Sequence, residues 1–192
     1  MGTIKTTNIE PIADNGTVTL GSSGDTFTMP SGVTMTVPSG GISGQNYPAF
    51  EAYGSADQTG VTDNVYTKVQ FNNELFDTNS MYDTSNYRFT PTIAGKYYVY
   101  SSFAMYASAG YSIFTSQIEI YKNGSAFSEL RQTEQASSNF PAKRTVHINK
   151  IVEFNGSTDY VEIFGRSNVV SGTVIFELSS TEGYFGAYRI GA

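Results

Sequence analysis

Few residues in this chain of 192 could carry out chemistry, and they are scattered. The sequence has no cysteine and one histidine, His147. An isolated histidine lacks the nucleophile and the orienting partner that base catalysis needs. A zinc ion would find only carboxylates besides this histidine. On the local alternation His147 points away from Val146 and Ile148. We therefore expect a structural role for it on a strand surface, and we predict no catalytic residues.

Calcium is the one cofactor that the sequence leaves open. Oxygen-rich loops suit calcium, and five aspartates lie in predicted loops: Asp57, Asp63, Asp77, Asp83 and Asp159. No loop has the ordered ligand spacing of a dedicated calcium site. We favour solvated loop aspartates, and we assign no metal ligand.

Carbohydrate chemistry or binding is the remaining possibility at the surface. Hydrolysis of a polysaccharide would need two carboxylates about 5–10 Å apart across a cleft, which a sequence cannot show. Binding is favoured over hydrolysis, because tyrosine offers a broad amphipathic contact surface. The loop candidates for binding a sugar or a protein are Tyr111 and Phe140. Their alternative role is ordinary packing against neighbouring loops.

Composition excludes other classes of function. Charged residues make up 15% of the chain and the net charge is −6, whereas nucleic-acid binders carry basic patches. No apolar run approaches the length of a membrane span. The N-terminal residues lack the apolar core of a secretory signal. We expect a protein that is assembled inside a cell, binds no nucleic acid and does not insert into membranes.

The elements that would position these residues are β-strands. Along 97–106, Tyr97, Val99, Phe103 and Met105 fall on one face, and Tyr98, Tyr100, Ala104 and Tyr106 fall on the other. Because both faces are apolar or aromatic, both should be covered. Further alternating segments are 116–121, 144–154, 160–164, 174–176 and 184–190. Asn123-Gly124 predicts a two-residue hairpin, and the polar stretch 129–143 predicts an exposed loop. Short strands with frequent turns indicate an all-β sandwich or jelly roll.

The N-terminal part has a different pattern. Residues 1–15 are polar, with Ile4, Ile9 and Ile12 as their only large apolar side chains. They predict either a disordered leader or a peptide that docks on a larger partner. Within 16–46, three Thr-apolar-Thr-apolar repeats are each closed by a turn, and a Gly-rich hinge follows. Such short strands bury too little to offset ordering the backbone at roughly 1–2 kcal/mol per residue. They need stacked neighbours, as in a short β-repeat shaft; the alternative is a flexible linker.

Residues 47–192 resemble the globular head of complement one-q and tumour necrosis factor proteins. The matching residues are Val69 and Phe71, Tyr82 and Asp83, Phe89 and Thr90, Gly95, Tyr97 and Tyr98, then 121–124 and 184–190. The family's glycine-aspartate pair is two residues looser here, at Gly156 and Asp159. The resemblance implies a jelly-roll β-sandwich whose inner sheet packs around a threefold axis. It implies a homotrimer whose interface contains Tyr98, Tyr100, Tyr106 and Tyr188.

The leader and shaft add a second resemblance. Residues 8–32 are similar to repeats in structural proteins of marine bacteriophages. The layout of leader, shaft, hinge and head then implies a trimeric fibre or spike at the virion surface, in the tail or the capsid. Ile4, Ile9 and Ile12 would dock on other virion proteins, and the head would attach to a host-surface glycan or protein. The alternatives are a capsid decoration or stabilising protein without host binding, and a secreted ligand or lectin of the same family.

Overall fold

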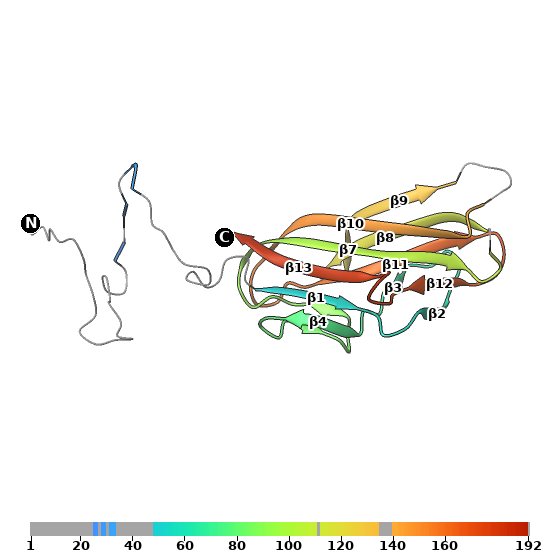
Figure 1. Cartoon of the computed structure of the whole chain (residues 1–192), viewed down its shortest axis with the longest axis horizontal. Coiled ribbons are helices and arrows are strands. Elements are labelled where there is room, and N and C mark those ends of the chain that lie inside the picture. The colour runs from blue at the N-terminus through green and yellow to red at the C-terminus, as the bar shows by residue number, and fades with distance from the viewer. Residues whose placement is uncertain are drawn as a thin grey trace, which may run out of the picture. The chain divides into compact units, whose positions relative to one another are not determined.

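A computed structural model of the chain (Figure 1) describes residues 25–26, 28–29, 31–33, 48–110, 112–134 and 140–191. The chain divides into the units Met1–Ser43 and Gly44–Ala192. The predicted leader lies outside the described residues, as does most of the predicted shaft. The few shaft residues that are described include a turn at 31–32, where Gly32 has a φ of 85°.

Every regular element among the described residues is a β-strand, which confirms the all-β prediction. The strands are β1 (Ala49–Tyr53), β2 (Gln58–Val61), β3 (Thr67–Lys68), β4 (Asn73–Asp77), β5 (Tyr82–Asp83), β6 (Arg88–Phe89), β7 (Gly95–Ala107), β8 (Ile113–Lys122), β9 (Ser125–Thr133), β10 (Lys143–Phe154), β11 (Val161–Val169), β12 (Val174–Glu177) and β13 (Tyr184–Gly191).

The strands form two antiparallel sheets that pack face to face. The β7 sheet has seven strands in the order β2-β12-β7-β13-β1-β4, with β10 on the other edge of β7. The β8 sheet has six strands in the order β5-β6-β11-β8-β9, and β3 pairs with β11. Figure 1 shows β10, β7, β13 and β1 side by side in one layer. This is the predicted jelly-roll sandwich.

The long strand β7 directs alternate side chains into the core and onto the exterior of its sheet. Tyr97, Val99, Phe103 and Met105 are fully buried between the two sheets. Their neighbours on the opposite face, Tyr98, Tyr100 and Tyr106, are half-buried. The alternation that the sequence predicted is therefore confirmed, and the strand presents tyrosine side chains on the outside of the sandwich.

The core is built around stacked aromatic rings. Phe50 stacks on Tyr82 at 4.7 Å and on Phe89 at 4.4 Å, and it meets Phe185 edge-on at 5.0 Å. The Tyr82 hydroxyl donates a hydrogen bond of 2.7 Å to the backbone carbonyl of Phe71. Burial, with a smaller contribution from Glu74, raises the pKa of Tyr82, so its phenol stays protonated. These rings come from both sheets and hold them together.

The β8–β9 hairpin confirms one prediction and corrects another. Asn123 and Gly124 have φ values of 53° and 76°, as a two-residue turn requires. The predicted loop over 129–143 is wrong in its first part, because β9 continues to Thr133. In this strand only Leu130 packs against the core, so the strand lacks the apolar alternation by which it could have been recognised.

Candidate functional site: a tyrosine-rich sheet face

Four tyrosines lie together on the exterior of the β7 sheet. We call this surface the tyrosine face; it consists of Tyr98, Tyr100, Tyr184 and Tyr188. Tyr98 and Tyr188 are direct cross-strand partners, with ring centroids 5.5 Å apart. Tyr100 lies 6.0 Å from Tyr98, 5.9 Å from Tyr184 and 6.4 Å from Tyr188. Strands β7 and β13 position all four through their two-residue alternation.

A glycine and a glutamate orient the central ring of this face. Gly186 is the cross-strand partner of Tyr100, and a Cβ at residue 186 would overlap the Tyr100 ring. The Tyr100 hydroxyl donates a hydrogen bond of 2.8 Å to Glu51 Oε2 on β1. Burial, and then this carboxylate, raises the pKa of Tyr100. The phenol therefore stays protonated and keeps donating well above neutral pH.

The tyrosine face borders a shallow hollow of about 370 Å³ against β10, which His147 and Asn149 also line. His147 is exposed and points away from Val146 and Ile148, as the sequence predicted. The two serines closest along β7 are already engaged with the backbone: Ser101 donates to Tyr184 O at 2.8 Å, and Ser102 donates to Val146 O at 3.1 Å. The hollow offers aromatic rings and hydroxyl groups, which suit binding.

Apolar side chains extend the face at its edges. Ile151 on β10 is the cross-strand partner of Tyr98 and is 55% exposed. Ile190, near the end of β13, is 44% exposed. Exposed apolar side chains therefore lie beside the tyrosine face on β10 and near the end of β13.

Of the four tyrosines predicted for an interface, the structure brings together Tyr98, Tyr100 and Tyr188. Tyr106 lies farther along β7, where its hydroxyl donates to Asp57 Oδ2 at 3.1 Å. It borders a second hollow of about 410 Å³ together with Lys143 and Glu177. Lys143 forms ion pairs with Glu177 and, at 3.2 Å, with Glu182.

Sequence reasoning missed Tyr184 as a member of the tyrosine face. The signal was present in the last strand, because Tyr184 precedes Tyr188 by four residues and alternation places both on one side.

The other residues predicted for docking or ligand binding are not among the four that make up the tyrosine face. Ile4, Ile9, Ile12 and Tyr111 lie outside the described residues. Phe140 is half-buried and meets Phe114 edge-on at 6.1 Å; its ligand-binding role stays a prediction.

All five aspartates accept hydrogen bonds from other residues of the protein. The prediction that they lie in loops is wrong for Asp77 and Asp83, which are the last residues of β4 and β5. Asp83 accepts hydrogen bonds from the backbone of Ser85 and Asn86, and Asp77 accepts one of 2.7 Å from Tyr82 N. Asp63 accepts one of 2.8 Å from Val169 N. Over the described ranges, no group of three or more histidine, cysteine, aspartate or glutamate side chains is placed to hold a metal ion. None of the described segments forms a helix of the length and apolarity that crossing a membrane requires.

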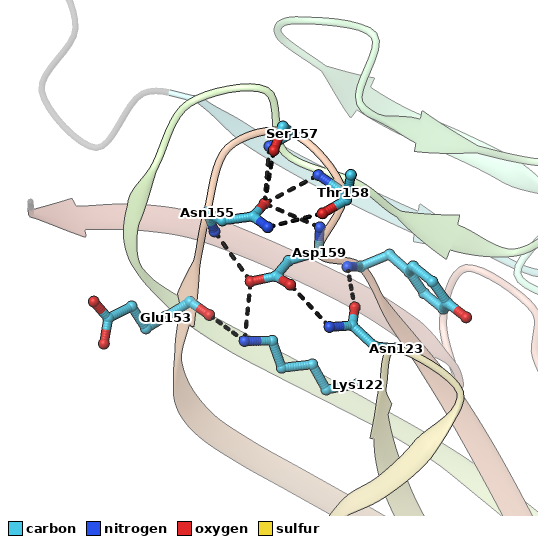
Figure 2. Close-up of polar contacts among 8 residues, drawn as sticks. Lys122, Asn123, Glu153, Asn155, Ser157, Thr158 and Asp159 are labelled. Carbon is cyan, nitrogen blue, oxygen red and sulfur yellow. Dashed lines mark hydrogen bonds and ion pairs between the residues drawn. The ribbon is translucent and has the colours of Figure 1, made fainter.

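Asp159 joins two loops at one end of the sandwich (Figure 2). It accepts a hydrogen bond of 2.8 Å from Asn123 Nδ2 in the β8–β9 turn and forms an ion pair of 3.1 Å with Lys122. Asn155 N donates to the same carboxylate at 3.1 Å. The hydrogen bond from Asn123 is the main reason that the pKa of Asp159 is lowered. Gly156, with a φ of 73°, lets this loop approach the backbone of Ala94 closely.

Comparison with known proteins shows which fold this is. No protein-family model matches the chain, and no curated protein matches it in sequence. Solved structures do match. The globular domain of zebrafish complement 1qA protein superposes with a TM-score of 0.51 at 16% identity, over 74% of this chain and 97% of that one. Eiger TNF from S. frugiperda gives 0.51 at 10% identity, over 73% and 90%. Murine APRIL, in a crystal structure at pH 5.0, gives 0.53 at 11% identity, over 73% and 97%.

Proposed function

We propose that the chain is a non-enzymatic attachment protein whose head forms a homotrimer and buries the tyrosine face at a threefold axis. The observation that carries this proposal is the tyrosine face itself, in which three tyrosine rings surround that of Tyr100 on the outside of the sandwich. The likeness to complement and tumour necrosis factor heads supports the sandwich on which the face is built.

Covering the tyrosine face with another copy of the chain is energetically more favourable than leaving it in contact with water. Burying apolar area releases about 25 cal/mol per Å², and aromatic residues are enriched at the centres of protein interfaces. The exposed Ile151 at one edge lies beside the hollow that the tyrosines line. When two different surface patches of one chain bind each other in neighbouring copies, the copies form a closed ring if the rotation between them divides a full turn evenly. Three heads would then cover one another's tyrosines.

The setting that we propose is a virion. Two expectations from the sequence support this setting: the resemblance of residues 8–32 to repeats in structural proteins of marine bacteriophages, and the predicted order of leader, shaft and head, which would suit a fibre or spike. The head would project from the virion surface toward a host glycan or protein. Weak contacts repeated around a threefold axis, and over many copies, produce avidity without a tight single site.

Sedimentation of the full chain tests the assembly. We expect a stable trimer at micromolar concentration, whereas a stable monomer at that concentration would overturn the proposal.

Deleting residues 1–15 tests the attachment to the particle: the truncated chain should still form trimers but should no longer incorporate into virions. Incorporation at the normal level would refute the docking role of Ile4, Ile9 and Ile12.

Measuring host binding distinguishes the proposed attachment role from two alternative functions. If virions with and without the head bind host cells equally, the protein is a capsid decoration or stabilising protein. If the chain is found free outside cells and binds a cell-surface receptor or a sugar, it is a secreted ligand or lectin. Attachment predicts that virions lose host binding when the head is removed.

A further inference from the structure

Two glutamates face each other on the exterior of the β8 sheet. Glu119 on β8 and Glu129 on β9 are direct cross-strand partners, which places their Cβ atoms about 4.5–5.5 Å apart. Like charges in this arrangement destabilise a sheet unless something neutralises them. Glu119 is also 94% buried, with 6% of its surface exposed, so water stabilises its charge only weakly.

An irregularity in the hairpin creates this pair. From Lys122 opposite Ser125 to Tyr121 opposite Ala126, the register is that of a regular two-residue hairpin. The register then shifts between Ile120 and Tyr121, and Phe127 is left without a partner. Without this bulge Glu119 would lie opposite Ser128. The bulge instead places it opposite a second carboxylate, and bulges are known to re-aim side chains in this way.

The buried oxygens of this cluster lack donors. Glu119 Oε2 and Gln117 Oε1 are both buried without a hydrogen-bond partner, and Gln117 is 2% exposed. Gln117 and Glu119 are two residues apart, so they share the exterior face of β8. An ionised carboxylate in such a site is unfavourable unless a positive charge compensates it. Burial, and then the charge of Glu129, raises the pKa of Glu119.

The surrounding hydrogen bonds fix the carboxylate of Glu129, whereas Oε2 of Glu119 receives none. Gln117 Nε2 donates to Glu129 Oε1 at 2.9 Å and to the Tyr66 hydroxyl at 3.1 Å. The Tyr66 hydroxyl donates to Glu129 Oε2 at 3.1 Å. These bonds hold the Glu129 carboxylate beside Glu119 in a defined orientation. They also turn the amide nitrogen of Gln117 to Glu129, so its oxygen is free to accept.

The neighbouring arginines do not neutralise the pair. Arg166 lies 5.2 Å from the centre of the Tyr66 ring, and its Nε donates to Asn64 Oδ1 at 2.9 Å. Neither Arg166 nor Arg131 forms an ion pair with Glu119 or Glu129 in the described part of the chain. Both arginines are cross-strand partners of Gln117 and share its face of the sheet, but no ion pair of the described residues satisfies either glutamate.

We infer that Glu119 and Glu129 bind a divalent cation, with the side-chain carbonyl of Gln117 as a neutral third ligand. All three ligands are hard oxygens on two adjacent strands. Calcium fits them best, because it accepts irregular oxygen shells completed by water, whereas magnesium demands near-ideal octahedral geometry and zinc prefers nitrogen and sulfur. The site lies in the sheet opposite the tyrosine face, so it is independent of the proposed trimer.

Terbium is the sharpest probe for this site, since it replaces calcium and emits when a nearby tyrosine is excited. Tyr66 contacts Glu129 directly and would serve as the donor. With the full chain at pH 7, we expect tyrosine-sensitised terbium emission that calcium displaces, and a Tm that rises with calcium. Glu119→Gln, which keeps the side-chain volume and removes the charge, should weaken binding at least about tenfold. Glu74→Gln on exposed β4 is the matched control and should bind like the wild type.

Two results would overturn the inference. Emission and a calcium-dependent Tm that are equal in the wild type and in Glu119→Gln would place the cation elsewhere, at the loop aspartates. No emission and no effect of calcium on Tm, with Glu119→Gln more stable than the wild type at pH 7, would mean that a shared proton neutralises the pair. Far-UV circular dichroism establishes that each variant is folded, so loss of binding in Glu119→Gln alone supports the site.

Discussion

The phenol ring of Tyr100 lies over the backbone of Gly186, its cross-strand partner on β13. The absence of a side chain at residue 186 lets the ring extend across the neighbouring strand, where its hydroxyl reaches Glu51 on β1. One glycine thereby links three strands and sets the shape of the tyrosine face. The aromatic-phenylalanine-glycine order in 184–186 thus acquires a physical reason.

Replacing this glycine should deform the tyrosine face without unfolding the sandwich. In Gly186→Ala the new methyl group would displace the Tyr100 ring and break its hydrogen bond to Glu51, at a cost of about 1 kcal/mol. Urea unfolding at fixed protein concentration measures this loss, and sedimentation should show weaker self-association. Gly191→Ala on the same strand is the control, because a Cβ there meets no atom within 4 Å. Wild-type self-association in Gly186→Ala would show that the position of Tyr100 does not matter to assembly.

A charge at the edge of the tyrosine face should prevent assembly. Ile151 is exposed in the single chain, so Ile151→Asp should leave the fold unchanged. In the proposed trimer the carboxylate would be buried in an apolar contact, which costs more than about 1.4 kcal/mol, or a tenfold weaker association. Analytical ultracentrifugation compares it with Val65→Asp, which carries the same change at a position 48% exposed in a loop. If the two variants associate equally well, Ile151 lies outside the interface.

Much of the fold could be predicted because its strongest strands carry their own pattern. The alternation of β7, the Asn123-Gly124 turn and the aromatic order of β13 depend on residues close together in the sequence. Strands β9 and β4 could not be found in this way. Leu130 is the one residue of β9 that packs against the core, and β4 exposes Leu75 and Phe76. Their existence depends on pairing with neighbouring strands, which no local pattern records.

The candidate sites differ in the same respect. Tyr98, Tyr100 and Tyr188 could be predicted, because alternation and the family resemblance place them on one face. The pair of Glu119 and Glu129 could not, since it depends on a one-residue bulge that shifts the register of the hairpin. From the turn residues alone, Glu119 would have been placed opposite Ser128. A register that depends on packing escapes reasoning from sequence.

Removing a central ring of the core should be the most costly single change. Phe50 is fully buried and contacts the rings of Tyr82, Phe89 and Phe185. Phe50→Ala should lower the free energy of unfolding by about 3–5 kcal/mol, measured by chemical denaturation at constant concentration. Phe114→Ala is the control, because Phe114 is 37% exposed and its loss should cost about 1 kcal/mol or less. Similar losses in both variants would contradict the central place of Phe50.

The loop junction at Asp159 should make stability depend on acid pH. The pKa of this carboxyl is lowered, first by the hydrogen bond from Asn123 and further by Lys122. A group whose folded pKa lies below its unfolded value stabilises the fold above the unfolded value, about 3.9 for aspartate. That contribution is lost as the pH falls through the folded pKa. Asp159→Asn should therefore cost about 1 kcal/mol at pH 7, with the partial exposure of the pair keeping the figure low.

The same variant distinguishes the charge of Asp159 from its shape. Between pH 7 and pH 2, the difference in unfolding free energy between the wild type and Asp159→Asn should shrink toward zero, because the wild-type carboxyl becomes neutral. Glu153→Gln is the control, since only the backbone carbonyl of Glu153 contacts Lys122. A difference that stays constant with pH would mean that the amide disrupts the hydrogen bonds of Asn155 and Asn123 by its geometry. Asp159 would then hold the two loops together by shape, and its charge would contribute nothing to the stability of this end of the sandwich.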